Sequence, residues 1–408
     1  MPELWREHMN PDPILSRLNR AVRLGEGTVK VEDLTFLAEM AVLVRMLNIK
    51  DLALEDLSAL VSTAVYSVAL ENRGQIARNT LEAALAKYID TFRRRPEKKF
   101  AMVTSISVSP GSLRARRRVG GCTLLCDADT SRFPVKDETL LPKISPYASQ
   151  VRVPHYAGVV VHVSARSLHE AFARSEERLC ELRGIWNWLI NFRRRTHYFG
   201  TLPNPINQVR LGPVHTLHEP DGALIPDRFW IDRHCETSLT PFDFSTDKGK
   251  KVLEGEKRFR RKLARHAHRD FIWQCMRRYA QILDSAAFER AYAELWGLLE
   301  TLTLTHRAHY DTTVRRAGFS WRDQTYARAE LEHLRECRND MVHAGTPQHD
   351  SYDLVCRLRK YCEQLLLLWM VEFGQYPTDE VKLRLDAPRT EAALKRNIRI
   401  SKAILGRR

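Results

Sequence analysis

The amino-acid sequence predicts an α+β protein that is predominantly helical. Apolar residues recur at three- and four-residue spacings before residue 98 and again after residue 251, which is typical of amphipathic helices. Between these regions, short runs rich in Val, Ile and Thr alternate with turn residues, which is typical of strands. We therefore expect two helical units separated by a small mixed unit.

The first unit, residues 1–98, is expected to be a helical N-terminal region. The stretches "VEDLTFLAEMAVLVRMLNIKDL" and "LEDLSALVSTAVYSVAL" carry the helical spacing, with acidic residues early in each, where the helix dipole favours them. Pro96, in "DTFRRRPEKKF", is expected to end the last helix of this unit.

The middle unit, residues 99–250, is expected to combine strands with one long helix. Strand character is found in "FAMVTSISVSP", "RVGGCTLLCDA" and "HYAGVVVHVSA". The last of these leads into a helix for which Ser167 is the predicted N-cap and Glu170 occupies the capping-box position. The segment 200–250 is rich in Pro, Gly and Asn and is expected to be an irregular connection.

The third unit, residues 251–375, is expected to be a helical bundle. Four stretches have the spacing and length of bundle helices: "RDFIWQCMRRYAQIL", "AAFERAYAELWGLLETL", "ARAELEHLRECRNDMVHAG" and "SYDLVCRLRKYCEQLLLLWMVEF". Residues 376–408 are expected to form a basic, loosely held C-terminal tail. The sequence shows no internal repeat.

The net charge points to a polyanionic partner. With 408 residues, a formal charge of +15 and a pI near 9.6, the chain favours nucleic acid first. The N-terminus lacks a signal-peptide core, and the longest apolar run, "LLLLWMV", is too short to span a bilayer. We therefore expect a cytoplasmic protein with no membrane partner.

The sequence offers no sign of a metal or a cofactor. None of the eight cysteines forms a CxxC pair, and no P-loop or dinucleotide-binding motif is present. An ATPase or a dinucleotide-dependent enzyme is therefore disfavoured, and we expect neither a metal nor a cofactor.

The stretch "CRNDMVHAGTP" places a permanent charge on an apolar helix face. Ala327, Leu331, Leu334, Met341 and Val342 form one apolar arc, and Arg338 falls in its middle. Burying an unpaired guanidinium is costly, so such an exception is expected at a functional site. The structural alternative is that Arg338 binds a neighbouring carboxylate.

Two polar residues accompany Arg338. Asn339 and His343 share a helix face one turn apart, and Gly345 and Pro347 place His343 in the last helical turn. A histidine beside a fixed cation and an amide suits metal-free phosphodiester cleavage, with the histidine moving protons and the arginine stabilising negative charge. A two-fold dimer would supply two histidines to one cleft. The alternative is that His343 only caps helix carbonyls.

The motif "RNDMVH" resembles the RNxxxH signature of HEPN domains, small four-helix bundles that commonly act as metal-independent ribonucleases. "LEHLRECRND" is similar to the corresponding stretch in the Apea-like branch of that family, and the resemblance covers roughly residues 260–375. It implies a homodimer that cleaves RNA by attack of the 2′-hydroxyl, in antiphage defence or toxin-like growth arrest. Arg338 and His343 would be the catalytic pair, and Asn339 would position the substrate.

The resemblance leaves other roles open. HEPN domains often carry a further polar residue on the second helix, and either Glu294 or Glu300 could supply it. A trigger or an antidote protein is a possible partner. Many HEPN domains have lost catalysis, so the alternative is a non-catalytic module that binds nucleotide, RNA or a partner defence protein.

Basic clusters could follow an RNA backbone. The stretch "EKRFRRKLARHAHRDF" includes Arg258, Arg260, Arg261 and Lys262, with Phe259 as a ring that could stack on bases. Arginine triplets also occur at residues 93–95, 116–118 and 193–195, and solvated helix ends explain these equally well. A DNA-binding regulator is a weaker alternative, because residues 31–95 contain no convincing recognition helix.

Overall fold

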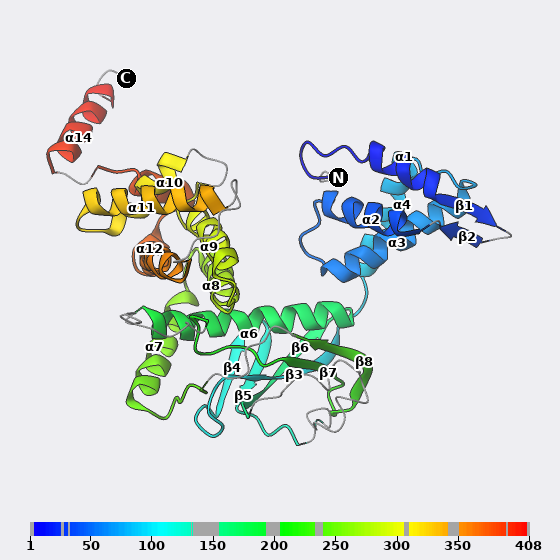
Figure 1. Ribbon diagram of the computed structural model, residues 1–408, viewed down its shortest axis with the longest axis horizontal. Helices are drawn as coiled ribbons and strands as arrows, with labels where there is room; N and C mark the ends of the chain where they lie inside the picture. The colour runs from blue at the N-terminus through cyan, green and yellow to red at the C-terminus, as the bar shows by residue number, and fades with distance from the viewer. Residues whose placement is uncertain are drawn as a thin grey trace.

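The computed structural model describes residues 4–25, 28–31, 33–131, 133, 155–192, 205–232, 240–305, 310–341, 351–388 and 391–405. Within these ranges the chain has thirteen α-helices, a two-stranded hairpin and a six-stranded antiparallel sheet, which confirms the predicted, predominantly helical α+β class. Figure 1 shows an N-terminal helical unit, a sheet covered by one long helix, and a C-terminal group of helices. In the same part of the chain, no helix is both long and apolar enough to cross a bilayer.

The N-terminal unit has its own apolar core, to which Leu18, Leu43, Val61 and Leu85 contribute fully buried side chains. A short hairpin that the sequence did not predict joins its first two helices. The elements are α1 (Asp12–Ala21), β1 (Val22–Gly25), β2 (Thr28–Val31), α2 (Asp33–Met46), α3 (Leu54–Glu71) and α4 (Arg78–Arg93).

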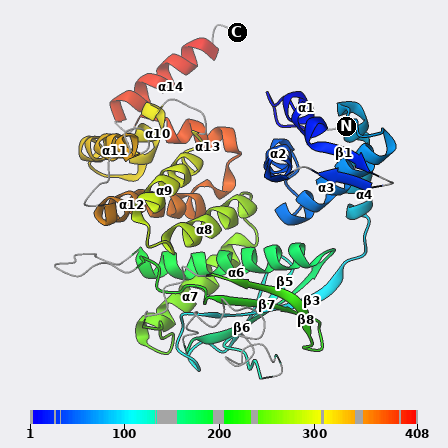
Figure 2. The ribbon, with the colours of Figure 1, turned by 45° about the vertical axis from the view of Figure 1, so that its right-hand side comes forward.

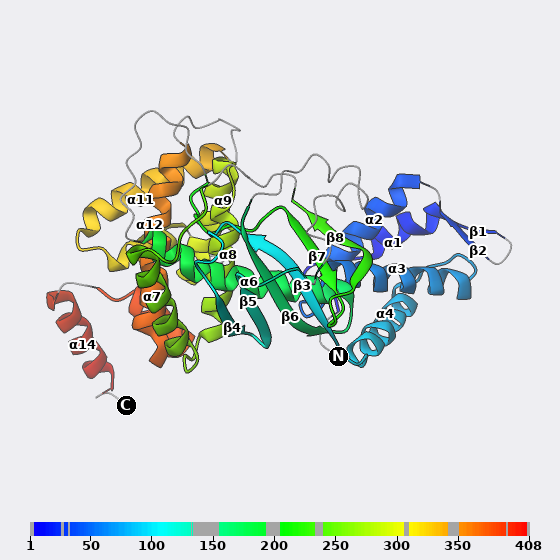
Figure 3. The ribbon, with the colours of Figure 1, turned by 90° about the horizontal axis from the view of Figure 1, so that it is seen from below.

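The sheet has the order β4-β5-β6-β3-β7-β8, and its apolar core includes Leu124, Val161 and Leu217. Seen from below, it lies between the N-terminal unit and the C-terminal helices (Figure 3). Its strands are β3 (Lys98–Ile106), β4 (Ala115–Val119), β5 (Cys122–Cys126), β6 (Ala157–Ala165), β7 (Val214–His218) and β8 (Leu224–Ile231).

Strands β7 and β8 correct the expectation of an irregular connection over residues 200–250. Their turn contains Gly222 with φ of 103°, a backbone conformation that favours glycine. Pro226 lies in β8, which is the edge strand, where a missing backbone N–H is tolerated. The edge strand β8 and the turn before it therefore carry part of the turn-like composition that suggested a loop.

Helix α6 (Leu168–Asn191) is shared by the sheet and the C-terminal helices. The predicted cap is confirmed: Ser167 Oγ accepts a hydrogen bond from the backbone N–H of Glu170 at 2.9 Å. Trp186 is buried in the core of the sheet, whereas Ile185 and Trp188 are buried in the core of the C-terminal helices. Figure 2 shows α6 between the two layers.

All four helices predicted for the C-terminal unit are present, and they bury one continuous apolar core. The helix that precedes them, α7, begins at Thr246, whose Oγ1 accepts from the N–H of Gly249. The helices are α7 (Asp247–Leu263), α8 (Arg269–Leu283), α9 (Phe288–Leu302), α10 (Tyr310–Ala317), α11 (Gln324–Asn339) and α12 (Ser351–Val371).

The region after residue 375, expected to be a loosely held tail, contains two helices. In α13 (Thr378–Leu385), Val381 and Leu385 are buried in the core of the C-terminal helices. Directly after it, Asp386 forms an ion pair with Arg316 at 2.6 Å. The buried apolar residues of α13 thus hold it against the C-terminal helices. The last helix, α14 (Glu391–Leu405), stands apart from the other helices in Figures 1, 2 and 3.

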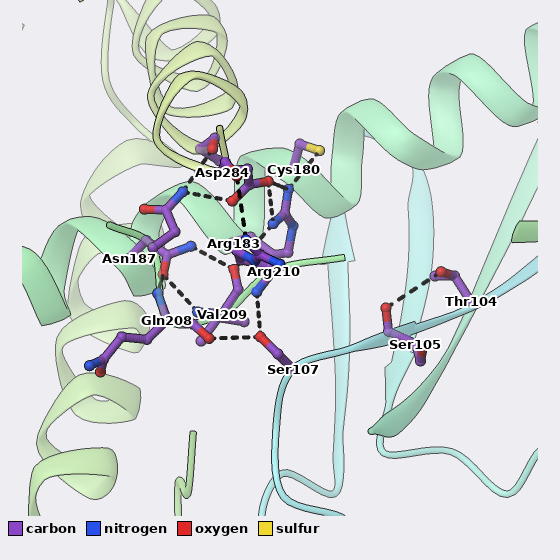
Figure 4. A network of polar contacts seen from close by, with 12 residues as sticks. Thr104, Ser105, Ser107, Cys180, Arg183, Asn187, Gln208, Val209, Arg210 and Asp284 are labelled. Carbon is purple, nitrogen blue, oxygen red and sulfur yellow. Dashed lines mark hydrogen bonds and ion pairs between the residues drawn. The ribbon is translucent and has the colours of Figure 1, made fainter. Parts of the chain in front are cut away.

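A buried polar network, which we call the junction, fixes α6 against α8 (Figure 4). Arg183 is fully buried; its Nη1 donates to Asp284 at 2.9 Å and to the carbonyl of Val209 at 3.1 Å. Asn187 bonds to the backbone of residues 208 and 209. The helices also touch through their backbones, since a Cβ on Gly184 would lie 2.2 Å from the carbonyl oxygen of Met276.

Candidate functional site

The first candidate site is the end of α11. Asp323 caps the start of this helix by accepting from the N–H of Tyr326 at 3.0 Å. The buried stripe ends at Cys337, and Arg338 beside it is half-buried rather than central. After Leu334, the next buried residue of α11 is Cys337, three positions later, and not Arg338, four positions later, as expected from the sequence. Arg338 therefore lies at the margin of the apolar face.

Arg338 contacts its predicted companion Asn339. Its Nη1 donates to Oδ1 of Asn339 at 3.2 Å. Beyond Asn339 the helix widens into a π turn over Asp340 and Met341, a distortion that is frequent at functional sites. His343 lies outside the described residues, so the geometry of the predicted trio is known for Arg338 and Asn339.

Glu294 and Glu300, the two candidates for a supporting role, are both engaged within their own helix, α9. Glu294 forms an exposed ion pair with Arg290 at 2.8 Å, and Glu300 accepts from Trp296 Nε1 at 3.0 Å. The residue of α9 that binds α11 is one the sequence did not suggest. The buried hydroxyl of Tyr292 donates to the carbonyl of Leu334, one turn before Arg338. Burial raises the pKa of Tyr292, so the phenol remains a neutral donor.

The second candidate site is a groove of about 780 Å³ between β4, α7 and the start of α8. We call it the basic groove. Most of its polar lining is cationic, and this lining comes from segments that are far apart in the sequence. The cations are Arg116, Arg117, Arg118, Lys257, Arg260, Arg261 and Arg269.

One buried carboxylate organises the groove. Glu256 is 1% exposed and pairs with Arg117 at 3.0 Å and with Arg260 at 3.1 Å. These two guanidiniums are therefore held by a carboxylate that is itself shielded from water. The shared carboxylate also joins β4 to α7, so the walls of the groove are fixed in place.

The other cations carry the surplus positive charge. Arg116 and Arg118 are exposed on alternate residues of β4, and so project from the same face of the strand. Lys257 and Arg261 are exposed one turn apart on α7. Among the described residues, none of these four side chains forms an ion pair. The groove therefore presents a positive field that an anionic ligand can neutralise.

The predicted RNA-binding residues divide between different surfaces. Arg260 and Arg261 line the basic groove, whereas Arg258 lines a second hollow together with Lys248, Lys251 and Phe192. Lys262 lines neither, and its Nζ donates to the carbonyl of Val371 at 3.4 Å.

Phe259 corrects a prediction, because it is 6% exposed and belongs to the core of the C-terminal helices. It lies on the buried face of α7 with Val252 and Leu263, so its ring cannot stack on bases.

The arginine triplets have different outcomes. In the triplet at 93–95, Arg93 pairs with Asp51 at 2.8 Å and Arg94 pairs with Asp90 at 2.8 Å, so these two are paired in the N-terminal unit. The triplet at 116–118 lines the basic groove. The triplet at 193–195 lies outside the described residues. Within the described ranges, no three His, Cys, Asp or Glu side chains are grouped as metal ligands.

Comparison of the chain with protein-family models, with curated proteins and with solved structures finds no match.

Proposed function

We propose that this protein is a metal-independent RNA endonuclease of the HEPN type, which binds RNA in the basic groove and cleaves it at the end of α11. The observation that carries the proposal is the surplus of exposed cations in the lining of the groove, to which β4 contributes Arg116 and Arg118 and α7 contributes Lys257 and Arg261. Phosphate neutralisation dominates the affinity of proteins for nucleic acids. The overall charge of +15 supports the same ligand class.

The proposed chemistry needs a base, an acid and a stabiliser of negative charge. His343 of one subunit takes the proton of a ribose 2′-hydroxyl, and the resulting oxygen attacks the adjacent phosphorus. Arg338 stabilises the charge that builds on the phosphoryl oxygens, and Asn339 orients the phosphate through its amide. The 5′-oxygen leaves with a proton from the second histidine, and the products are a 2′,3′-cyclic phosphate and a free 5′-hydroxyl.

The second histidine requires a homodimer in which α11 meets its copy. Tyr326, on the first turn of α11, is 55% exposed and would be available for contact with the partner subunit in this dimer. In this proposal the enzyme acts in antiphage defence or growth arrest, and a trigger or an antidote protein regulates it.

The separation of the two sites bears on how the substrate is held. In Figures 1 and 2, α7 and α11 lie on opposite sides of the C-terminal helices. A strand held in the groove must therefore run along these helices to reach Arg338. Remote contacts of this kind provide binding energy that fixes the reacting bond in place. The same separation favours the alternative function, a non-catalytic HEPN module that binds RNA, nucleotide or a partner protein.

A cleavage assay on total RNA, with sequencing of the new ends, separates the two functions. We expect Arg338→Ala and His343→Ala each to lower the cleavage rate by about 100-fold or more while RNA affinity changes little. The matched control is Arg328→Ala, which removes an exposed arginine of the same helix that is paired with Glu332. If purified wild-type protein binds RNA and leaves it intact, with growth unaffected on overexpression, the alternative is correct.

A further inference from the structure

The aromatic residue in the basic groove is Trp273, on the second turn of α8. Its side chain is half-buried and packs at the margin of both the sheet core and the core of the C-terminal helices. Among the described residues, its indole makes no hydrogen bond, and no other ring or guanidinium stacks on it. The part of the ring that lines the groove is therefore available to a ligand.

Cations from α7, α8 and β4 line the same groove as this ring. Arg269 lies one turn earlier on α8, and α7 contributes Lys257 and Arg261 to the lining. On β4, Arg116 and Arg118 are separated by the repeat of alternate strand residues, about 6.8 Å. A row of cations beside an accessible ring is the arrangement that holds phosphates on one side and bases on the other.

Packing at the margin of the two cores leaves the part of the ring that lines the groove without a stacking partner. Trp230 provides a comparison, because it is also half-buried at the margin of the sheet core, but its ring is stacked on Phe172 at 3.7 Å and 8°. No such partner covers Trp273 within the described part of the chain. The indole is thus a planar surface without a stacking partner, placed among positive charges.

We propose that Trp273 is a stacking platform for an unpaired nucleobase of the RNA bound in the basic groove. The inference rests on the proposed RNA-binding function and adds the residue on which a base stacks. A base inside a duplex already has neighbours on both faces, so only an unpaired base can lie on the indole. The groove therefore favours single-stranded segments over duplexes of the same length and charge.

The test uses the full-length protein and short RNA oligonucleotides of one sequence, either single-stranded or annealed to a complement. We expect Trp273→Leu to lower the affinity for the single strand about tenfold and to leave duplex binding and the salt dependence unchanged. Trp273→Phe should retain most of the affinity, because its ring can still stack. The matched control, Trp230→Leu, should bind both RNAs as the wild type does.

Abasic substitution gives a readout that altered packing would not produce. Removing single bases along the strand should weaken wild-type binding strongly at one position, and Trp273→Leu should abolish this positional effect. If abasic substitution weakens wild-type binding equally at every position, or if Trp273→Leu retains the positional effect, the stacking platform is disproved. The proposed RNA binding is not affected by that result.

Two further results keep the test decisive. If the wild type binds neither RNA, both the platform and the proposed function fail. If circular dichroism shows that Trp273→Leu is unfolded, Trp273→Phe decides. In that case a tenfold loss of affinity for the single strand in a folded Trp273→Phe protein contradicts the platform.

Discussion

The junction and the basic groove are both built around arginines, yet the arginines are used in opposite ways. In the junction, the fully buried Arg183 binds Asp284 and the carbonyl of Val209. In the groove, Glu256 serves two guanidiniums, and the exposed Arg116 and Arg118 have no carboxylate partner among the described residues. The first arrangement holds the protein together, whereas the second leaves positive charge for a ligand.

Burial and pairing therefore decide, more than local sequence does, whether an arginine stabilises the fold or remains available to a ligand. An isolated charge in the interior is so costly that evolution supplies it with partners, and its removal leaves those partners unsatisfied. An exposed arginine costs little, and its pair energy is small. We therefore expect mutations in the junction to change stability and mutations in the groove to change affinity.

The largest effect is expected for Arg183→Met. The substitution removes the cationic partner of Asp284 and one of the two side-chain donors to the carbonyl of Val209, which keeps only Asn187, and it should lower the free energy of unfolding by about 3–5 kcal/mol. Urea denaturation followed by circular dichroism measures it. A loss below about 1 kcal/mol would mean that the junction is not the structural site we describe.

The second effect is a pH dependence centred on His215, which lines a cavity with Arg183. The pKa of His215 is lowered from 6.5 to about 4, chiefly because the imidazole is buried; Asp232 opposes this shift, and the positive charge of Arg183 contributes to it. The unfolded chain therefore binds a proton between pH 6.5 and pH 4 that the folded chain does not, and stability is lost as the pH falls through this window.

The contribution of His215 amounts to about 3 kcal/mol at most. Denaturation at pH 7, 5.5 and 4 should show a steeper loss for the wild type than for His215→Gln, which cannot take up the proton. Parallel stability profiles for the two proteins would contradict the buried neutral histidine.

The smallest effect on stability, and a clear effect on binding, is expected for the double substitution Arg116→Gln with Arg118→Gln. Stability should change by less than about 0.5 kcal/mol, since both side chains are exposed. The slope of log affinity against log salt should fall by about 2, because each arginine releases about one counterion. Arg93→Gln with Arg94→Gln is the matched control, and an equal loss of affinity in both double variants would remove the distinction between groove and surface.

The helices were predictable because each carries its own periodic signal. The N-cap Ser167 could be located from the sequence because a helix cap is a local structure, whereas the carboxylate of Glu170, predicted to complete a capping box, accepts from the N–H of Arg166 instead of Ser167. Strand β8 could not be recognised, because its place at the edge of the sheet, which tolerates Pro226, depends on pairing with distant strands. The half-buried position of Arg338 could not be predicted, because ideal helical angles do not decide whether residue 337 or residue 338 is the last buried residue of α11.

The basic groove could not be predicted from the sequence, for the same reason. The triplet at 116–118 and the cations of α7 were each visible in the sequence, but nothing local indicates that Glu256 joins them. Their assembly depends on the packing of β4 against α7, which is a property of the whole fold. The sequence around Trp273 did not single it out either, because α8 also contains several other apolar residues, and these are buried.

Because α6 contributes Trp186 to one core and Trp188 to another, the C-terminal helices are not a detachable module. A fragment that begins at residue 251 would sever α7 after its first turn and discard the cap at Thr246. It would also uncover the surface on which Ile185 and Trp188 rest. The smallest independently expressible piece that keeps both sites therefore extends from the first strand of the sheet through α13, and trimming it further should yield aggregates instead of a folded protein.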